Sequence, residues 1–235
     1  MNRALVVALL RQRLASPMRL VLLLMLIVPG LGAALLTHSL TPVAGSGYWF
    51  ALILAAGAIG QDFSSGVLHL TFARPVTRPT YVLSRWFAAA FGAFALSLAQ
   101  VIPVALTVAA NGGERPLAAF AAVTLENFVL AAAGAAVMVC LSSLVDGLGD
   151  VGLFALGTFT LEVGRMLATF KHWSAVEGVI GELQKTLHPQ VSFGWLAGQG
   201  SPEWTGLAIA ASTIALGLAI AIVRVNRREL SYAAG

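Results

Sequence analysis

Apolar runs long enough to cross a membrane recur along most of this chain, and they restrict its possible folds more than any other feature. A helix needs about 17 or more such residues to cross a hydrocarbon core roughly 30 Å thick. With 58% hydrophobic and 10% charged residues, the composition also excludes an ordinary soluble domain. We therefore predict an all-α, polytopic membrane bundle in one domain, residues 1–235. Its six predicted spans are residues 20–36, 43–60, 86–110, 117–141, 151–170 and 205–225.

The distribution of Lys and Arg predicts how this bundle is oriented. Basic residues near helix ends remain on the cytoplasmic side of a membrane. With six spans both termini share one side, and the other side carries only Arg115, Lys171 and Lys185. We therefore expect a multi-pass protein with both termini in the cytoplasm. The basic residues on the terminal side are Arg3, Arg11, Arg13, Arg19, Arg74, Arg78, Arg85, Arg224, Arg227 and Arg228.

Two further helices are predicted outside the spans. Residues 1–19 are expected to form a helix at the inner surface, because a second Arg cluster interrupts an apolar run that would otherwise resemble a secretory signal. Between the fifth and sixth spans, apolar residues recur at spacings of three and four, which predicts an amphipathic outer helix of about four turns. It is expected to end at His188-Pro189. Such a helix either fills a long loop at the outer interface or acts as a gate over an exit path.

Several classes of site are not supported by the sequence. It contains no phosphate-binding Gly-x-x-x-x-Gly-Lys-Ser/Thr, no His-Glu-x-x-His and no Gly-x-Ser-x-Gly. If ATP is used, another chain must bind it. The four histidines are scattered without Cys or carboxylate at ligand spacing, so no metal site is expected, and Cys140, the single cysteine, is interpreted as a packing residue. Basic and aromatic residues are not interleaved, so nucleic acid is not an expected partner.

Three ionisable residues fall well inside predicted spans, away from their ends, where burial of a charge is costly unless it is paired or hydrated. Glu162 and Arg165 lie three apart, so they share a helix face and can form a structural ion pair. Alternatively they belong to a polar stripe that lines a transport path or a dimer seam. Glu126 has no evident partner in its own helix; it can face a cavity, hydrogen-bond to the helix that carries Gln100, or lie near the outer interface.

A polar, Arg-bearing segment, residues 61–86, separates the second and third predicted spans, and we call it the inner elbow. Pro75 and Pro79 lack a backbone donor and disfavour helical conformation at Arg74 and Arg78. The pattern therefore predicts a stiff bend that offers apolar contacts before the bend and basic ones around it. Such a segment can transmit force from a docked partner, or it can simply anchor the chain to anionic lipid.

The inner elbow resembles the corresponding loop of type V ATP-binding-cassette exporter permeases, a bacterial family of six-span subunits. In that family an acidic residue precedes x-x-x-Gly-Thr, followed by Pro-Val-Ser-Arg and then a Lys at the start of the third span. This chain has Asp62-x-x-x-Gly66-Val67, then Pro75-Val76-Thr77-Arg78, then Arg85. The spacing agrees, while Asp, Val and Arg replace the usual Glu, Thr and Lys. The Arg227-Arg228-Glu229-Leu230 ending and the outer helix are also similar to the family.

The resemblance implies a permease subunit of an exporter in a bacterial plasma (inner) membrane, without enzymatic activity of its own. It implies a second permease copy, identical or a close paralogue, and a separate ATPase in two copies that carry ATP and Mg. An accessory extracytoplasmic protein and membrane lipids are further expected partners. The implied ATPase contacts are Asp62, Gly66, Leu70, Arg74, Pro75, Thr77, Arg78 and Arg85. Glu126, Glu162 and Arg165 are the candidates for the path or the dimer seam.

Two other functional classes are compatible with parts of the sequence. An ion-driven secondary transporter would titrate Glu126 or Glu162, although no Gly/Pro-broken helices occur at matched positions in two halves of the chain. A membrane enzyme is disfavoured because no nucleophile and base occur at compatible depth.

Overall fold

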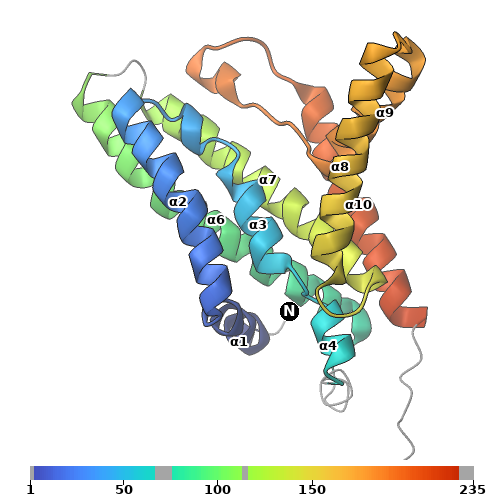
Figure 1. Ribbon diagram of the computed structural model, residues 1–235. Helices are drawn as coiled ribbons and strands as arrows, with labels where there is room; N and C mark the ends of the chain where they lie inside the picture. Colours follow the sequence, from blue (N-terminus) through green and yellow to red (C-terminus); the bar gives the residue numbers. More distant parts are fainter. Residues whose placement is uncertain (1–2, 67–75, 113–115, 228–235) are drawn as a thin grey trace, which may run out of the picture.

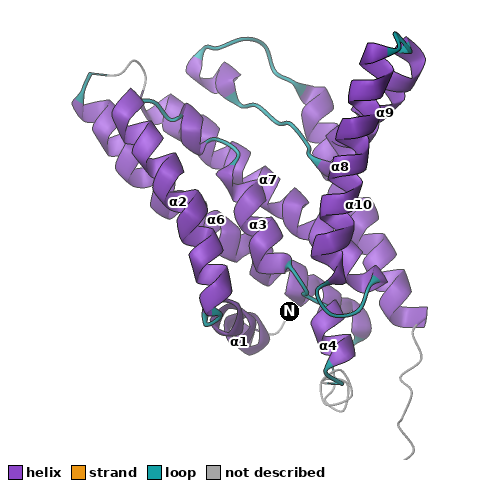
Figure 2. Ribbon diagram, in the orientation of Figure 1, coloured by secondary structure: helices purple, strands orange, loops and turns teal. Residues whose placement is uncertain are grey.

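Helices account for all regular secondary structure in the part of the chain that the computed structural model describes, residues 3–66, 76–112 and 116–227 (Figures 1 and 2). Six segments in these ranges are long and apolar enough to cross a membrane, which confirms the predicted number. They are α2 (Pro17–Thr37), Thr41–Ser64, α6 (Arg78–Ala110), α7 (Pro116–Leu144), α8 (Gly149–Phe170) and α10 (Trp204–Arg227). The remaining helices are α1 (Arg3–Leu14), α9 (Ser174–Leu187) and a short turn, η2 (Gly194–Ala197).

The second span is discontinuous, unlike the other five. It consists of the short turn η1 (Thr41–Val43), α3 (Ser46–Ala55) and α4 (Gly60–Ser64), with turns over residues 56–59. Both described ends of the chain, at α1 and at the end of α10, lie at the same end of the bundle as α4 (Figure 1). We call this the inner end, and the opposite end, with α9 and η2, the outer end.

The core forms where α3 packs between α6 and α7. Phe50, Ala51, Ala131 and Ala135 are fully buried there, and Tyr48 lies beside them. A Cβ on Gly134 would lie only 2.9 Å from the Tyr48 carbonyl oxygen, so small residues on α7 permit close contact between the helix backbones. The Ala-rich stretch of the fourth span therefore packs as such sequences are expected to pack.

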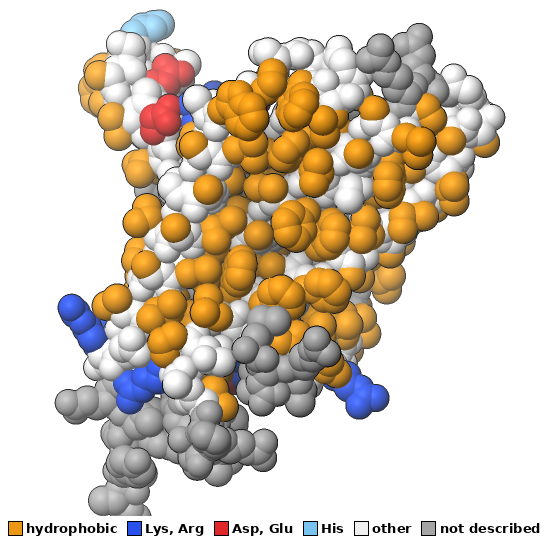
Figure 3. All heavy atoms as spheres, turned by 180° about the vertical axis from the view of Figure 1, so that it is seen from behind, with side chains coloured by type: hydrophobic (Ala, Val, Ile, Leu, Met, Phe, Trp, Pro, Cys, Tyr) orange, Lys and Arg blue, Asp and Glu red, His pale blue; other side chains and the backbone are white. Residues whose placement is uncertain are grey.

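Helices α2 and α8 form the two sides of the bundle and lie on either side of α3 (Figure 1). Their large apolar side chains, such as Met25 and Val28 on α2 and Phe159 and Met166 on α8, are mostly exposed. Apolar side chains also cover the middle of the opposite face, whereas Lys and Arg gather near the inner end (Figure 3). This distribution is typical of a surface that contacts lipid or another membrane chain.

The third span begins earlier than the hydropathy pattern predicts. Helix α6 starts at Arg78, where the Thr77 hydroxyl accepts a hydrogen bond from the Thr80 amide and Pro79 occupies the first turn. Proline is tolerated there because the first amides of a helix have no helical partner. The prediction that Pro79 keeps Arg78 out of a helix is therefore wrong. The helix contains Arg85 well inside its length.

The amphipathic helix predicted between the last two spans is present as α9, but it does not lie flat across the outer end. It runs back along α8: Thr169 donates to Glu177 over 3.1 Å, and Thr158 lies 3.4 Å from the His188 ring. The Thr213 hydroxyl on α10 reaches the Thr186 carbonyl at 3.2 Å. Helices α8 and α9 thus form an antiparallel hairpin whose second arm returns toward the middle of the bundle.

Candidate functional site

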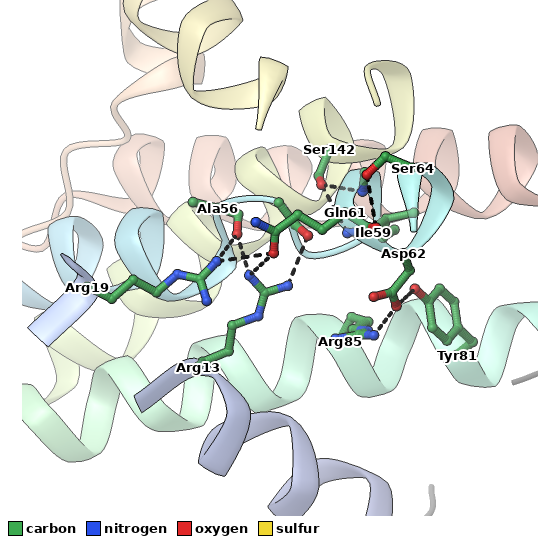
Figure 4. A network of polar contacts seen from close by, with 12 residues as sticks. Arg13, Arg19, Ala56, Ile59, Gln61, Asp62, Ser64, Tyr81, Arg85 and Ser142 are labelled. Atoms are coloured by element: carbon green, nitrogen blue, oxygen red, sulfur yellow. Dashed lines mark hydrogen bonds and ion pairs between the residues drawn. The ribbon is translucent and has the colours of Figure 1, made fainter. Parts of the chain in front are cut away.

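The break in the second span leaves backbone groups without helical partners near the inner end. Helix α3 ends at Ala55 and α4 starts at Gly60, and Gly57 between them has a φ of +65°, a conformation that favours glycine. Within a hydrocarbon core each such unpaired group would be costly. Side chains from four other helices converge on these groups: Arg13, Arg19, Ser142 and Asp150. We call the resulting cluster the inner network, and Figure 4 shows Arg13, Arg19 and Ser142 in place.

Helices α7 and α8 supply the acceptors of the inner network. The Ser142 hydroxyl oxygen accepts from the amides of Ile59 and Gly60, both at 2.9 Å. The Asp150 carboxylate accepts from the Gly57 amide at 2.6 Å. Both side chains are fully buried. Two polar residues at the inner ends of α7 and α8 therefore replace the missing helical acceptors.

Helices α1 and α2 supply the donors. The Arg13 guanidinium donates to the carbonyls of Ala56 at 2.5 Å and Gly57 at 2.9 Å, and Arg19 donates to Ala56 at 3.0 Å. Both arginines also reach the Gln61 side-chain oxygen at 3.4 Å (Figure 4). Burial, together with the nearby charges of Arg19 and Arg85, lowers the pKa of Arg13 to about 10, so Arg13 remains charged at neutral pH.

Replacement of Ser142 tests this arrangement. Ser142→Ala leaves two buried amides without an acceptor, and we expect it to lower the free energy of unfolding by about 2 kcal/mol. Ser143→Ala is the matched control, because among the described residues the Ser143 hydroxyl bonds only to the Cys140 carbonyl of its own helix, at 2.6 Å. Thermal unfolding of both variants in detergent measures the difference. Equal losses would show that the Ser142 acceptor is dispensable.

A second cluster lies beside the inner network and contains two of the predicted ATPase contacts. Asp62 on α4 forms a buried ion pair with Arg85 on α6, and the Tyr81 hydroxyl donates to the same carboxylate at 2.5 Å (Figure 4). Asp62 is 6% and Arg85 8% exposed, so neither side chain presents a surface to a docked protein. Direct contact of these two residues with an ATPase is therefore not supported; they join α4 to α6.

Of the other predicted contacts, Gly66, Thr77 and Arg78 lie in the described part of the inner elbow. Arg78 donates to the carbonyls of Val225 at 3.1 Å and Asn226 at 2.6 Å, at the end of α10. Thr77 caps α6, and Gly66 has a φ of +70°; no atom of the described residues lies within 4 Å of a Cβ added there. Leu70, Arg74 and Pro75 lie outside the described residues.

The three ionisable residues predicted inside spans do not come together. Among the described residues, the ion pairs are Arg85–Asp62 and Lys185–Glu182, so the predicted pair between Glu162 and Arg165 is not formed. Arg165 instead approaches the Gln184 side chain of α9 at 3.5 Å. Both Glu162 and Arg165 are exposed on α8, which leaves them accessible to a second chain.

Glu126 lies apart from the inner network, half-buried on α7, and lines a pocket at the outer end. On the helix named as a possible partner, the Gln100 side chain donates to the Ile27 carbonyl at 3.1 Å. The neighbouring Asn127 is fully buried and holds the start of α3, accepting from the Gly47 amide at 2.8 Å and donating to the Val43 carbonyl at 3.2 Å. Of the possibilities for Glu126, a position in a cavity and a position near the outer end are both compatible with this pocket.

A larger groove opens between α2 and α8 and has a volume of about 680 Å³. Leu22, Leu52 and Phe154 give it apolar walls, while Arg19 and Gln61 of the inner network lie at its inner end. The groove therefore has apolar walls and a polar inner end. We call it the inner groove.

The sequence patterns did not identify Arg13, Ser142 and Asp150 as site residues, although these side chains hydrogen-bond to the backbone groups at the break in the second span. Arg13 and Asp150 count as ordinary helix-end charges in a topology argument, and Ser142 as a loop residue. The signal that could have found them is the Gly57–Gly60 spacing inside an apolar run, which marks a helix break that needs polar partners. Within the described ranges, no three His, Cys, Asp or Glu side chains are grouped so as to hold a metal ion.

Comparison with known proteins does not assign a family to this chain. No family model matches the sequence, and no curated protein matches it. The resemblance to exporter permeases accordingly depends on the inner-elbow spacing and on the order of the helices.

Proposed function

We propose that this chain is the transmembrane permease subunit of an ATP-binding-cassette exporter in a bacterial plasma membrane. Two copies would pair, and two separate ATPase subunits carrying ATP and Mg would dock at the inner elbow. The chain itself would perform no chemical reaction. The observation that carries the proposal is the Asp62–Arg85 ion pair, which joins the two helices on either side of the undescribed segment 67–75.

The connections of these two helices explain how a force on the elbow can spread through the subunit. On one side α4 continues into the inner network, which includes Arg13 of α1, Ser142 of α7 and Asp150 of α8. On the other side Arg78 joins the start of α6 to the end of α10. Movement of one docked segment would therefore reach nearly every helix. This connectivity favours a transmitting role over a plain lipid anchor.

The exposed flanks suggest where a second copy and a cargo would lie. Helices α2 and α8 carry apolar surface that no other described helix covers. Helix α8 also exposes Glu162 and Arg165, which suit a dimer seam. The inner groove between them would then face the partner subunit and form part of the path, with room for an amphipathic cargo. An accessory extracytoplasmic protein would meet the projecting α8–α9 hairpin.

Affinity purification from native membranes tests the class of protein directly. We expect a soluble ATPase to co-purify, and its hydrolysis of ATP to change when the two are reconstituted together. An ion-driven secondary transporter, which would use Glu126 or Glu162, predicts instead that the chain alone moves solutes down a proton or Na⁺ gradient. Transport without any ATPase, abolished by Glu126→Gln or Glu162→Gln, would establish that alternative.

Site-directed cross-linking tests the docking position separately. In a Cys140→Ser background, Ser65→Cys places a thiol at an exposed position of the inner elbow, directly after α4. We expect a bismaleimide to link it to the ATPase in the purified complex. Ala175→Cys, exposed on α9 at the outer end, is the control and should give no such product. Linking from both positions, or from neither, would contradict docking at the elbow.

A further inference from the structure

A pocket of about 340 Å³ lies at the outer end, between α3, α7 and the chain that follows α9. We call it the outer pocket. Its volume falls within the range of small-molecule sites, and it is far larger than a single metal ion. Glu126 lies on its α7 wall, ten residues from Pro116, or about 15 Å along the helix at 1.5 Å per residue. The side chains that matter here are Tyr48, Trp49, Glu126, Leu130, His188 and Glu203.

The outer pocket is lined by acidic side chains and by no basic one. Glu126 and Glu203 both line it, and none of its lining residues is Lys or Arg. Burial lowers the pKa of His188, against a smaller opposing influence of Glu162, and so disfavours a positive charge on its ring. No hydrogen bond or ion pair within the described ranges engages the Glu126 carboxylate. A half-buried carboxyl group without a partner would gain a counter-ion from a bound cation, which would favour its ionised form.

The aromatic walls of the pocket suit a cation with apolar substituents. The Tyr48 and Trp49 rings are perpendicular, at 88°, with centroids 5.6 Å apart. The His188 ring lies 5.5 Å from Tyr48 and 5.9 Å from Trp49. Tyr48 is held in place by the hydrogen bond from its hydroxyl to the Leu187 carbonyl. Aromatic rings at an angle to one another, beside carboxylates, are the usual means of binding quaternary ammonium groups.

We propose that the outer pocket binds an organic ammonium ion, with Glu126 as its counter-ion and Tyr48 and Trp49 as its aromatic walls. Glu203 lies exposed at the mouth and adds attraction for an approaching cation. Leu130 contacts the apolar substituents. The site belongs to this chain alone, so its occupancy requires neither an ATPase nor the exporter assignment.

Phenyltrimethylammonium is a suitable probe because tert-butylbenzene is its neutral isostere. Equilibrium binding of the radiolabelled cation is measured on the full chain in nanodiscs of zwitterionic lipid. We expect saturable binding that tert-butylbenzene does not displace. Glu126→Gln and Trp49→Leu should each weaken it by about tenfold or more, the factor that corresponds to 1.4 kcal/mol.

Glu177→Gln is the matched control, because it removes the same charge from α9 outside the pocket and should leave binding unchanged. Thermal unfolding of each variant shows whether it is folded, and Glu126→Asp should retain most of the affinity if Glu126→Gln proves unstable. The proposal is overturned if binding is not saturable, if the neutral isostere competes equally, or if folded Glu126→Gln binds like the parent chain. Loss of ATPase association would bear on the proposed function and not on this site.

Discussion

Neutralising one member of the buried Asp62–Arg85 pair should be among the most destabilising single changes in this protein. Asp62→Asn leaves Arg85 charged and buried, and the Nε and Nη1 atoms of Arg85 already lack a hydrogen-bond partner within the described residues. Arg85→Gln leaves the Asp62 carboxylate uncompensated in the same way. Removal of one partner of a buried pair typically costs about 3–5 kcal/mol. We expect each variant to unfold at markedly lower temperature in detergent, with reduced yield.

The double variant Asp62→Asn/Arg85→Gln separates loss of the pair from exposure of a lone charge. It leaves no buried ion, so its free energy of unfolding should exceed that of either single variant. The surface pair Glu182–Lys185, whose side chains are at least half exposed, is the control: Glu182→Gln should change the stability by less than about 1 kcal/mol. Additive losses in the double variant would mean that the two residues act independently.

Substitution of Gly60 should have the second large effect, because the backbone of another segment occupies the space a side chain would need. A Cβ on Gly60 would lie 2.5 Å from the Val145 carbonyl oxygen and 2.7 Å from that of Gly147. The Gly147 amide also donates to the Gly60 carbonyl at 2.8 Å, so the two segments cannot separate without loss of this bond. We expect Gly60→Ala to cost about 3 kcal/mol.

Gly157→Ala provides the comparison for that change. Gly157 lies on α8, and a Cβ there would meet no atom within 4 Å. Alanine is the better helix former by roughly 0.5–1 kcal/mol, so this variant should be neutral or slightly more stable. Equilibrium unfolding of both variants under the same conditions measures the contrast. If Gly60→Ala were as stable as Gly157→Ala, the close contact between α4 and the α7–α8 connection would be wrong.

The spans were predictable because hydropathy over about 20 residues depends on composition and not on neighbours. The break in the second span was not predictable, because its polar partners are far away in the sequence. Arg13 is 44 residues from Gly57, and Asp150 is 93 residues from it. For the same reason, the spacing of 23 residues between Asp62 and Arg85 did not predict that the two side chains form an ion pair.

Glu162 and Arg165 illustrate the opposite error. Their spacing of three correctly places them on one helix face, but a shared face does not ensure a contact when another element competes. Helix α9, whose position no local pattern indicates, brings Gln184 toward Arg165. The cavity around Glu126 likewise depends on where the chain returns after α9. Local periodicity predicted the helices well and their mutual contacts poorly.

The broken second span also constrains the order in which the protein can be assembled during synthesis. Its free amides at Gly57, Ile59 and Gly60 need Asp150 and Ser142, which leave the ribosome 82 to 93 residues later. Until then this span cannot settle stably among lipids, and must be sheltered by the insertion machinery or remain in contact with water. A nascent chain released before α7 and α8 emerge would therefore expose backbone amides without hydrogen-bond acceptors, a feature that membrane quality-control proteases can recognise.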